Sequence, residues 1–305
     1  MIDQRTAPPS ATNVCALVVA YYPDDGFEAR LVPILPQVAM LLIVDNTPDA
    51  LPLSQHFQEK WDGTLFTIKN NGNKGIAKAL NQGLSFASER GFPWLLTLDQ
   101  DTNIYSDIVR TLSNTYVECE PAPAVIGANY IDRQNKRIKV KPQNRMGYVV
   151  QKTVITSGSL IDVTVAMHIS GFSEDYFIDQ VDHEFCLRVR ANGGRVVISR
   201  KPTMEHSVGE TGGAWLPLLG HLPSHPPLRK YYIARNSLVT ITRYWRSEPT
   251  WCLRRALRLL LGLPLMAVLE RQRVSKVRAF CAGIADGWCG RMGPCGREWL
   301  TESTG

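Results

Sequence analysis

Residues 94–101 read Trp-Leu-Leu-Thr-Leu-Asp-Gln-Asp, an apolar run that ends in two carboxylates. Three shorter apolar runs precede it, at residues 14–20 (VCALVVA), 40–44 (MLLIV) and 65–68 (LFTI). Runs of this length without polar alternation are typical of strands that are buried on both faces of a parallel sheet. The sequence therefore predicts four such strands in its first third.

Helices are predicted between these strands, over residues 27–35, 76–90 and 108–118. Strands and helices that alternate at this spacing favour a doubly wound α/β sheet. The second half alternates less regularly. It is predicted to form strands at residues 124–128, 153–155, 159–163 and 195–198 and a helix over residues 181–191.

The composition is that of an ordinary globular protein. The 305 residues are 44% hydrophobic and 20% charged, which is enough apolar material for one large α/β domain or for one domain with a smaller appendage. The seven cysteines are odd in number and none forms a C-x-x-C pair, so neither a disulfide framework nor a zinc site is predicted. The polar N-terminus lacks the apolar core of a signal peptide, and we expect a cytoplasmic protein.

Positive charge is concentrated near the C-terminus. Residues 226–305 hold fourteen Lys or Arg against five Asp or Glu, a balance of +9, whereas the whole chain carries +6 and the rest of it therefore −3. This asymmetry predicts that the C-terminal part meets an anionic surface. No recognisable nucleic-acid module accompanies the charge, so we expect a membrane surface and not nucleic acid.

A basic and apolar segment covers residues 253–269. Its uninterrupted apolar part, residues 259–269, has 11 residues, whereas a helix needs about 20 to span a bilayer. Pro264 is expected to break a helix there. A segment of this kind can lie in the membrane interface, and the alternative is a helix packed on the main domain.

Polar side chains stand at the carboxyl ends of the four predicted strands, where ligands bind in open parallel sheets. Asp99 and Asp101 together could bind one hard divalent cation that bridges substrate phosphates, although a lone D-x-D is more often a solvated turn. His206 follows a predicted strand and could complete a metal site, although a lone His is more often a structural residue.

Two further segments could carry chemistry. The glycine loop at residues 71–75 (NGNKG) opens a predicted helix, so its backbone N–H groups could bind an anion. It contains neither a P-loop nor a dinucleotide fingerprint, and an ordinary turn is the alternative. In residues 179–188 (DQVDHEFCLR), Asp182 could act as a general base, whereas Glu184 and Arg188 are spaced as a structural ion pair.

In this order, these segments resemble glycosyltransferase family 2, and within it the bacterial rhamnosyltransferases that use dTDP-rhamnose. The resemblance extends over residues 14–293, almost the whole chain. The matching stretches are VVAYYP (18–23), VDN (44–46), NKGIAKALNQG (73–83), LDQDT (98–102), SG (157–158), GF (171–172), FIDQVDHEFCLR (177–188), HSVG (206–209), YYIARN (231–236) and GIADGWCGRMG (283–293).

The resemblance implies an α/β GT-A fold, which is a Rossmann-like, mostly parallel central sheet with helices on both faces, here with a C-terminal helical extension. The implied parts are a loose N-terminal tail (1–13), a catalytic domain (14–240) with nucleotide-binding (14–120) and acceptor (121–240) halves, and a basic, apolar helical C-terminal region (241–305).

The resemblance also implies roles for single residues. Asp101, Asp99 and His206 would hold Mg²⁺ or Mn²⁺. The nucleotide would be bound by Tyr22, Asp45, Asn73, Lys74, Gly75, Lys78, Asn81, Asp99 and Gln100. The acceptor or the diphosphate would be contacted by Ser157, Gly158, Tyr231, Arg235 and Asn236, although the Tyr and Arg cluster on a helix could equally be core and surface packing.

Asp182 matches the family's catalytic base, but Val181 stands where the family usually has Glu, and Asp179 is the other candidate for the base. The implied reaction is a metal-dependent, inverting transfer of rhamnose from dTDP-rhamnose to a glycan or lipid-linked glycan in cell-surface polysaccharide (O-antigen) synthesis. The enzyme would associate peripherally with the inner face of the bacterial membrane.

Three alternatives to this reaction stay open to different degrees. The first is a family 2 enzyme that uses a UDP-linked hexose. The second is a sugar nucleotidyltransferase, although residues 14–30 lack the glycine-rich, basic phosphate loop of those enzymes. The third is a glycan-binding protein without activity, which would have no reason to keep the D-x-D, Asp182 and His206 together.

Overall fold

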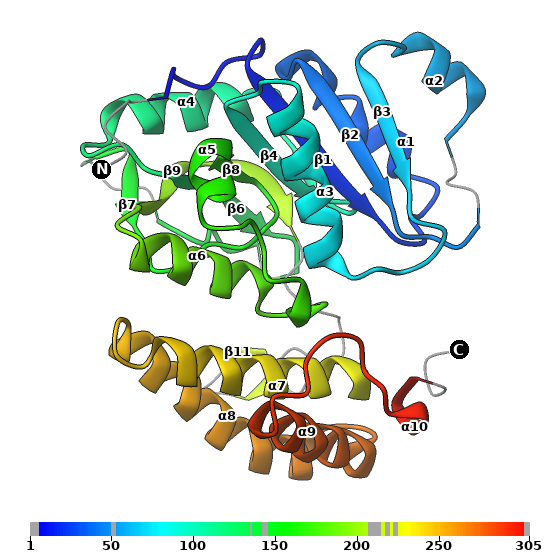
Figure 1. The fold of residues 1–305 in the computed structure, drawn as a ribbon, viewed down its shortest axis with the longest axis vertical. Coiled ribbons are helices and arrows are strands. Elements are labelled where there is room, and N and C mark those ends of the chain that lie inside the picture. The colour runs from blue at the N-terminus through cyan, green and yellow to red at the C-terminus, as the bar shows by residue number, and fades with distance from the viewer. Residues whose placement is uncertain are drawn as a thin grey trace. The chain divides into compact units, whose positions relative to one another are not determined.

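The structure is a computed structural model that describes residues 6–49, 53–134, 136–141, 146–206, 215–216, 220–221 and 225–301. The chain divides into two compact units (Figure 1). Unit 1 comprises Met1–Phe172 and Phe185–His206, and unit 2 comprises Ser173–Glu184 and Ser207–Gly305. Because the units are defined by compactness and not by activity, the predicted limits of the catalytic domain stay a prediction.

Four parallel strands form the first half of the sheet in unit 1, as the apolar runs predict. They are β1 (Val14–Ala20), β2 (Met40–Asp45), β3 (Leu65–Lys69) and β4 (Trp94–Asp99), in the spatial order β3-β2-β1-β4. In each strand except β3 almost every side chain is buried, which is what strands covered by helices on both faces require.

The second half of the sheet is mixed. The strand β8 (Ser159–Asp162) runs antiparallel to β4, and β6 (Val125–Asp132) runs antiparallel to β8. The long strand β9 (Val196–His206) is parallel to β6 and pairs with β5 (Asn103–Ile104) and β7 (Tyr148–Val150). This mixed sheet with its helices confirms the GT-A fold.

The prediction of a strand at residues 153–155 was wrong, because that segment forms no strand and β7 lies just before it. Val154 is buried by packing over Gly127, where an added Cβ would lie 2.8 Å from its Cγ1 atom. Local apolar character therefore reflects packing here and not strand pairing.

The helices of unit 1 lie mostly where the pattern predicts. They are α1 (Phe27–Leu31), η1 (Leu35–Gln37), α2 (Gln55–Lys60), α3 (Ile76–Glu89), α4 (Ile108–Glu118) and α5 (Val163–His168). The helix α6 (Val181–Ala191) belongs to unit 1 from Phe185 onward. The helix predicted over residues 27–35 stops at Leu31 because Pro33 has no N–H with which to continue the ladder.

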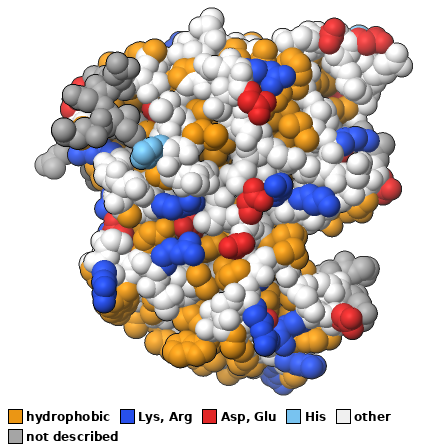
Figure 2. Space-filling view, in the orientation of Figure 1, with side chains coloured by type: hydrophobic (Ala, Val, Ile, Leu, Met, Phe, Trp, Pro, Cys, Tyr) orange, Lys and Arg blue, Asp and Glu red, His pale blue; other side chains and the backbone are white. Residues whose placement is uncertain are grey.

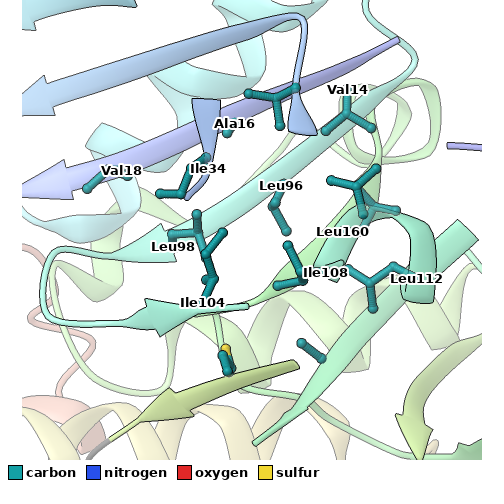
Figure 3. Packing of buried hydrophobic residues seen from close by; sticks show 14 of the residues in the cluster. Val14, Ala16, Val18, Ile34, Leu96, Leu98, Ile104, Ile108, Leu112 and Leu160 are labelled. Carbon is teal, nitrogen blue, oxygen red and sulfur yellow. The ribbon is translucent and has the colours of Figure 1, made fainter. Parts of the chain in front are cut away.

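Alternate side chains of β1 face opposite layers of helices. Val14, Ala16 and Val18 belong to a buried cluster with residues of α1 and α4, part of which Figure 3 shows. Leu17 points the other way, toward α3, where an added Cβ at Gly83 would overlap its side chain. Both faces of the sheet are therefore covered, and each fully buried leucine contributes about 1.5–3 kcal/mol.

The segment before β1 is attached to unit 1. The carbonyl oxygen of Thr6 accepts a hydrogen bond from Tyr116 Oη at 2.6 Å, and that of Ala7 accepts one from Trp94 Nε1 at 2.7 Å. We expected residues 1–13 to be a loose tail. The described part of that segment instead caps buried aromatic side chains whose polar atoms need partners.

Unit 2 is mainly helical. It contains η2 (Glu174–Tyr176), α7 (Pro227–Tyr244), α8 (Pro249–Leu269), α9 (Arg273–Trp288), α10 (Glu298–Thr301) and the antiparallel pair β10 (Trp215–Leu216) and β11 (Gly220–His221). The helices α7 and α9 approach closely, because a Cβ on Gly283 would overlap the carbonyl oxygen of Tyr231.

The expectation that Pro264 breaks a helix was wrong, since α8 continues through it. Proline removes only its own N–H, whose partner would be the carbonyl of Leu260. Leu260 is exposed, so water can satisfy that carbonyl. Among the described residues no helix is both long and apolar enough to cross a membrane.

The close approach of α7 and α9 predicts opposite effects for two glycine substitutions. Gly283→Ala should lower the free energy of unfolding by about 1–3 kcal/mol, because its methyl group meets backbone that cannot yield. Gly262→Ala, in α8, is the matched control: nothing lies within 4 Å of its added Cβ, and it should raise stability by up to about 1 kcal/mol. Urea unfolding followed by circular dichroism measures both, and equal effects would show that the α7–α9 contact is looser than described.

Candidate active site

The carboxyl ends of the parallel strands lie side by side, as their residues predict. In the strand register, Ala20 pairs with Asp45, Asp45 with Lys69, and Val19 with Asp99. Side chains from three loops that are far apart in sequence thus meet at one edge of the sheet, the edge where open α/β sheets bind ligands.

Asp99, Asp101 and His206 form a group that could hold a metal ion. Their ligand atoms all lie within 4.8 Å of one another, and His206 Nε2 is 3.9 Å from Asp99 Oδ2. His206 reaches this edge because it ends β9, which pairs with the short strand β5 directly after the Asp101 loop. Two carboxylates and one imidazole suit Mn²⁺ or Mg²⁺, so the donor set fits the predicted metal.

Buried hydroxyl groups fix the loop that carries the carboxylates. Ser157 Oγ accepts the backbone N–H of Asp99 at 3.1 Å and lies 2.6 Å from Thr102 Oγ1. Thr102 Oγ1 in turn lies 3.3 Å from His206 Nδ1, which orients the imidazole toward the carboxylates. Ser157 was predicted to contact the acceptor or the diphosphate, but it is buried and positions the loop.

The loop is also attached through Gln100 and two arginines. The Gln100 side chain exchanges hydrogen bonds with the backbone of Tyr21, at 2.6 and 3.0 Å. Arg30 donates to the Gln100 carbonyl at 2.7 Å and Arg133 to the Asp101 carbonyl at 2.8 Å. The predicted nucleotide contact Gln100 thus uses its amide within the protein, and the two arginines, which pair with Asp24 and Glu205, hold the backbone of the loop.

Asp45 has an unsatisfied oxygen in a buried position. The side chain is fully buried, its Oδ1 accepts the N–H of Thr47 at 2.8 Å, and its Oδ2 has no hydrogen-bond partner among the described residues. An unpaired buried acceptor costs about 1–3 kcal/mol, so it requires an explanation such as a ligand that donates to it. The same Thr47 also holds the exposed Tyr22, because its Oγ1 accepts the backbone N–H of Tyr22 at 3.0 Å.

The glycine loop is shaped by its own amides. Asn73 Oδ1 accepts the N–H of Gly75 at 2.9 Å, and Gly75 has a φ of +84°, which favours glycine. Lys74 and Lys78 are exposed beside the start of α3. Their charge and the helix N-terminus make this turn suitable for an anion.

Two predicted contacts prove to be packing residues. Asn81 donates to the carbonyl of Phe172 at 2.9 Å and accepts its N–H at 2.7 Å, so both ends of its amide bind backbone. Gly158 has a φ of +74°, and an added Cβ would lie 2.6 Å from Met204 Sδ. Sequence spacing placed both near the site but could not show these contacts.

The two carboxylates considered for proton transfer differ in their surroundings. Asp179 binds Arg229 through two hydrogen bonds, of 2.7 and 3.3 Å, and its side chain is almost buried. Asp182, at the start of α6, accepts only the N–H of His183 at 2.8 Å and has no ion pair among the described residues. A general base must be free to take up a proton, which favours Asp182.

The turn before Asp182 is strained and is held by α7. Phe177, Asp179 and Gln180 all have positive φ, at a cost of about 1–3 kcal/mol each. Asn236 Nδ2 lies at 2.8–2.9 Å from the carbonyl oxygens of Tyr176, Ile178 and Asp179 and donates to them. The fully buried amide thus fixes the conformation that the strain opposes.

The prediction that Tyr231, Arg235 and Asn236 contact the acceptor or the diphosphate is not supported by their positions. All three are buried. Arg235 donates to Asn236 and to the carbonyls of Asp175, Tyr176 and Gly293. Tyr231 Oη donates to Asp286 at 2.9 Å, and burial together with this bond raises the pKa of the tyrosine. These side chains have no donors left for a ligand.

Glu184 joins the same interior. It is fully buried and accepts hydrogen bonds from Tyr244 Oη at 2.7 Å, Ser173 Oγ at 2.9 Å and Arg243 Nη1 at 3.2 Å. Arg188, considered above as its ion-pair partner, donates to the carbonyls of Ile169 and Gly171 at 2.7 Å. Tyr244 and Arg243 could not be predicted as partners of Glu184, because they lie about sixty positions away in the sequence.

Known proteins resemble this chain over most of its length. The family model described as glycosyl transferase family 2 matches residues 34–177. The dTDP-rhamnosyl transferase RfbF of Shigella flexneri is 27% identical over 247 residues, which cover 76% of this chain and 81% of that protein.

Two solved structures share the fold. One is S. aureus TarS 1-349 in complex with UDP-GlcNAc, with a TM-score of 0.55, 14% identity and 92% of both chains covered. The other is GalNAc-T7 with UDP, GalNAc and Mn²⁺, with a TM-score of 0.54, 11% identity, and 91% of this chain and 56% of that chain covered.

The role of Asn236 can be tested by Asn236→Ala. Loss of three contacts should lower the free energy of unfolding by about 2–3 kcal/mol, since the carbonyls of Ile178 and Asp179 lose this donor, whereas that of Tyr176 keeps Arg235. Asn192→Ala is the control, because the Asn192 amide makes one exposed bond to the Arg188 carbonyl, and it should cost less than about 1 kcal/mol. Urea unfolding measures both, and similar losses would mean that Asn236 does not hold the turn.

Proposed function

Because this chain is a glycosyltransferase with a family 2 domain, we propose that it transfers rhamnose from dTDP-rhamnose to a glycan or lipid-linked glycan, with inversion and with Mg²⁺ or Mn²⁺. The observation that carries the proposal is the group Asp99, Asp101 and His206 at the strand ends, where Asp45 also lies. The similarity to a dTDP-rhamnosyl transferase supports the choice of donor.

Recognition of the nucleobase is assigned to Asp45. Thymine and uracil both carry an imide N–H, and the buried Oδ2 atom of Asp45 is an acceptor without a partner. A hydrogen bond from that imide would satisfy the carboxylate and would discriminate against a base with no N–H there. The exposed Tyr22 is available to cover the ring, and Lys74 and the start of α3 would face the negative phosphates.

The leaving diphosphate is assigned to the metal group. Asp99, Asp101 and His206 would hold the ion. Ser157 and Thr102 keep the loop that carries these ligands in place. A bound divalent cation would offset the charge that grows on the diphosphate, an effect worth several kcal/mol. Arg30 and Arg133 hold the backbone of the same loop.

Proton transfer is assigned to Asp182. The carboxylate takes the proton of the acceptor hydroxyl while that oxygen bonds to the anomeric carbon and the bond from this carbon to the diphosphate oxygen breaks. The transition state has oxocarbenium character, and attack opposite the leaving group inverts the anomeric carbon. Asp179 is not assigned this role, because Arg229 neutralises it.

A different donor is the main alternative within the family. The similar structures of TarS and GalNAc-T7 contain UDP-GlcNAc and UDP with GalNAc, and a UDP-linked hexose would use the same acceptor atom of Asp45. A sugar nucleotidyltransferase is the more remote alternative, and release of pyrophosphate from a nucleoside triphosphate and a sugar phosphate would identify it.

Calorimetry with dTDP and with UDP, each with and without Mn²⁺, tests the nucleotide. We expect binding that requires the metal and that is tighter for dTDP than for UDP. Tighter binding of UDP would retain the glycosyltransferase and change the sugar donor. A folded protein that binds neither nucleotide would contradict both the metal group and the Asp45 contact.

Two substitutions separate binding from turnover. Asp101→Ala should abolish metal-dependent dTDP binding, since it removes one of three ligands. Asp182→Asn should leave dTDP binding unchanged and lower kcat by about 10²–10⁴-fold, the usual contribution of a general base.

Asp175→Asn serves as the control for this pair, because Asp175 is an exposed carboxylate of the same segment as Asp182. It should alter neither binding nor turnover. If Asp182→Asn retains activity and Asp179→Asn does not, the base is Asp179 and the assignment is wrong.

A further inference from the structure

The helix α8 presents a long apolar stripe to solvent. Leu253, Leu257, Leu260, Leu261 and Val268 recur every three or four positions or multiples of them, so they lie on one face, and all are exposed. The exposed fractions of Leu260, Leu261 and Val268 are 71%, 63% and 69%. Contiguous exposed apolar surface of this kind marks an interaction site.

Positive charge accompanies this stripe along α8 and α9 (Arg273–Trp288), and neither helix carries an exposed acid. The helix contains three arginines and no Asp or Glu, and Arg254 and Arg258 follow stripe residues by one position and are exposed. Arg271, Arg273 and Arg278 are exposed in the segment that follows. Figure 2 shows hydrophobic and Lys or Arg side chains gathered over the C-terminal helices of Figure 1.

The two acids between residues 249 and 288 do not offset this charge at the surface. Glu270 binds Lys230 at 2.7 Å and Lys276 at 2.8 Å, and its side chain is almost buried. Asp286 is also almost buried and accepts two hydrogen bonds from Arg297, both at 2.8 Å. The exposed part of α8 and α9 is therefore apolar and cationic, and its partner should be apolar and anionic.

We propose that this face of α8 docks onto an anionic lipid bilayer. The helix would lie in the plane of the interface, with the leucines below the headgroups and Arg254 and Arg258 against lipid phosphates. A spanning arrangement does not fit, since no described helix is long and apolar enough to cross. A second copy of the chain is the other occupant of an apolar face, but the exposed arginines would repel their equivalents there.

The proposal goes beyond glycosyl transfer and does not depend on it. It requires only that α8 carries the stripe and that the charges beside it are free to meet phosphates. The sequence predicted a membrane surface for the C-terminal region as a whole, and the structure narrows this to residues 253–268 of one helix.

Flotation of the full chain with vesicles tests the surface. We expect binding to vesicles of phosphatidylcholine with phosphatidylglycerol, weaker binding as salt increases, and little binding to phosphatidylcholine alone. The double variant Leu260→Gln, Leu261→Gln should bind the anionic vesicles about tenfold less tightly or weaker still, because each buried leucine contributes about 1.5–3 kcal/mol. Both positions are exposed, so the variant should fold, and circular dichroism checks this.

Two further variants sharpen the test. Arg254→Gln, Arg258→Gln should remove most of the dependence on salt. Met167→Gln replaces an exposed apolar residue of α5 in unit 1 and should bind vesicles as the unaltered protein does. If the leucine variant loses vesicle binding but binds dTDP as the unaltered protein does, the membrane contact is independent of the proposed donor site.

Three outcomes would overturn the proposal. The first is a folded protein that binds no anionic vesicles, and the second is equal binding by the leucine variant. The third is a concentration-dependent dimer, seen by sedimentation, that the leucine variant abolishes, which would show that the face joins two copies of the chain.

Discussion

The alignment of β1 with its two parallel neighbours is the constraint on which the candidate site depends. Parallel strands pair with their carboxyl ends at one edge, so Asp45 and Asp99 must come together once β2 and β4 pair with β1. The strands are held in this register by burial on both faces, where a slip of one residue would exchange the side chains that face α3 with those that face α1 and α4. The chemistry at the edge is thus a consequence of how the apolar runs pack.

Much of this arrangement could be predicted from the sequence, because it follows from local patterns. The apolar runs gave the four parallel strands, and the segments between and after them gave α3, α4 and α6. What could not be predicted depends on partners far along the chain. The family resemblance suggested Asn236 as a ligand contact, yet its amide is enclosed by the turn at 176–179. Likewise, the polarity of Ser157 gave no sign that it binds the Asp99 backbone.

The pairing of β5 with β9 has a similar long-range effect. It places Asn103 opposite Glu205 and so brings His206, a hundred positions downstream, to the Asp101 loop. Apart from the family resemblance, the sequence presents His206 only as one histidine after a predicted strand, and a single histidine is weak evidence. Its position beside two carboxylates changes the meaning of all three, because an isolated D-x-D is usually a turn, whereas an Asp-Asp-His group with hydrogen-bonded supports has the composition of a metal site.

The two units fix a candidate site carboxylate in different ways. In unit 1 the Asp99 loop follows directly from a buried strand, so the sheet itself sets its position and only short hydroxyl contacts are added. In unit 2 the turn before Asp182 has no strand to follow and contains three residues with positive φ. Buried polar groups of α7 hold the conformation there, and each of these groups needs hydrogen-bond partners for all its donors. A fold that places Asp182 directly after such a turn needs the YYIARN segment inside its core, which explains why those polar residues are buried and not exposed to a ligand.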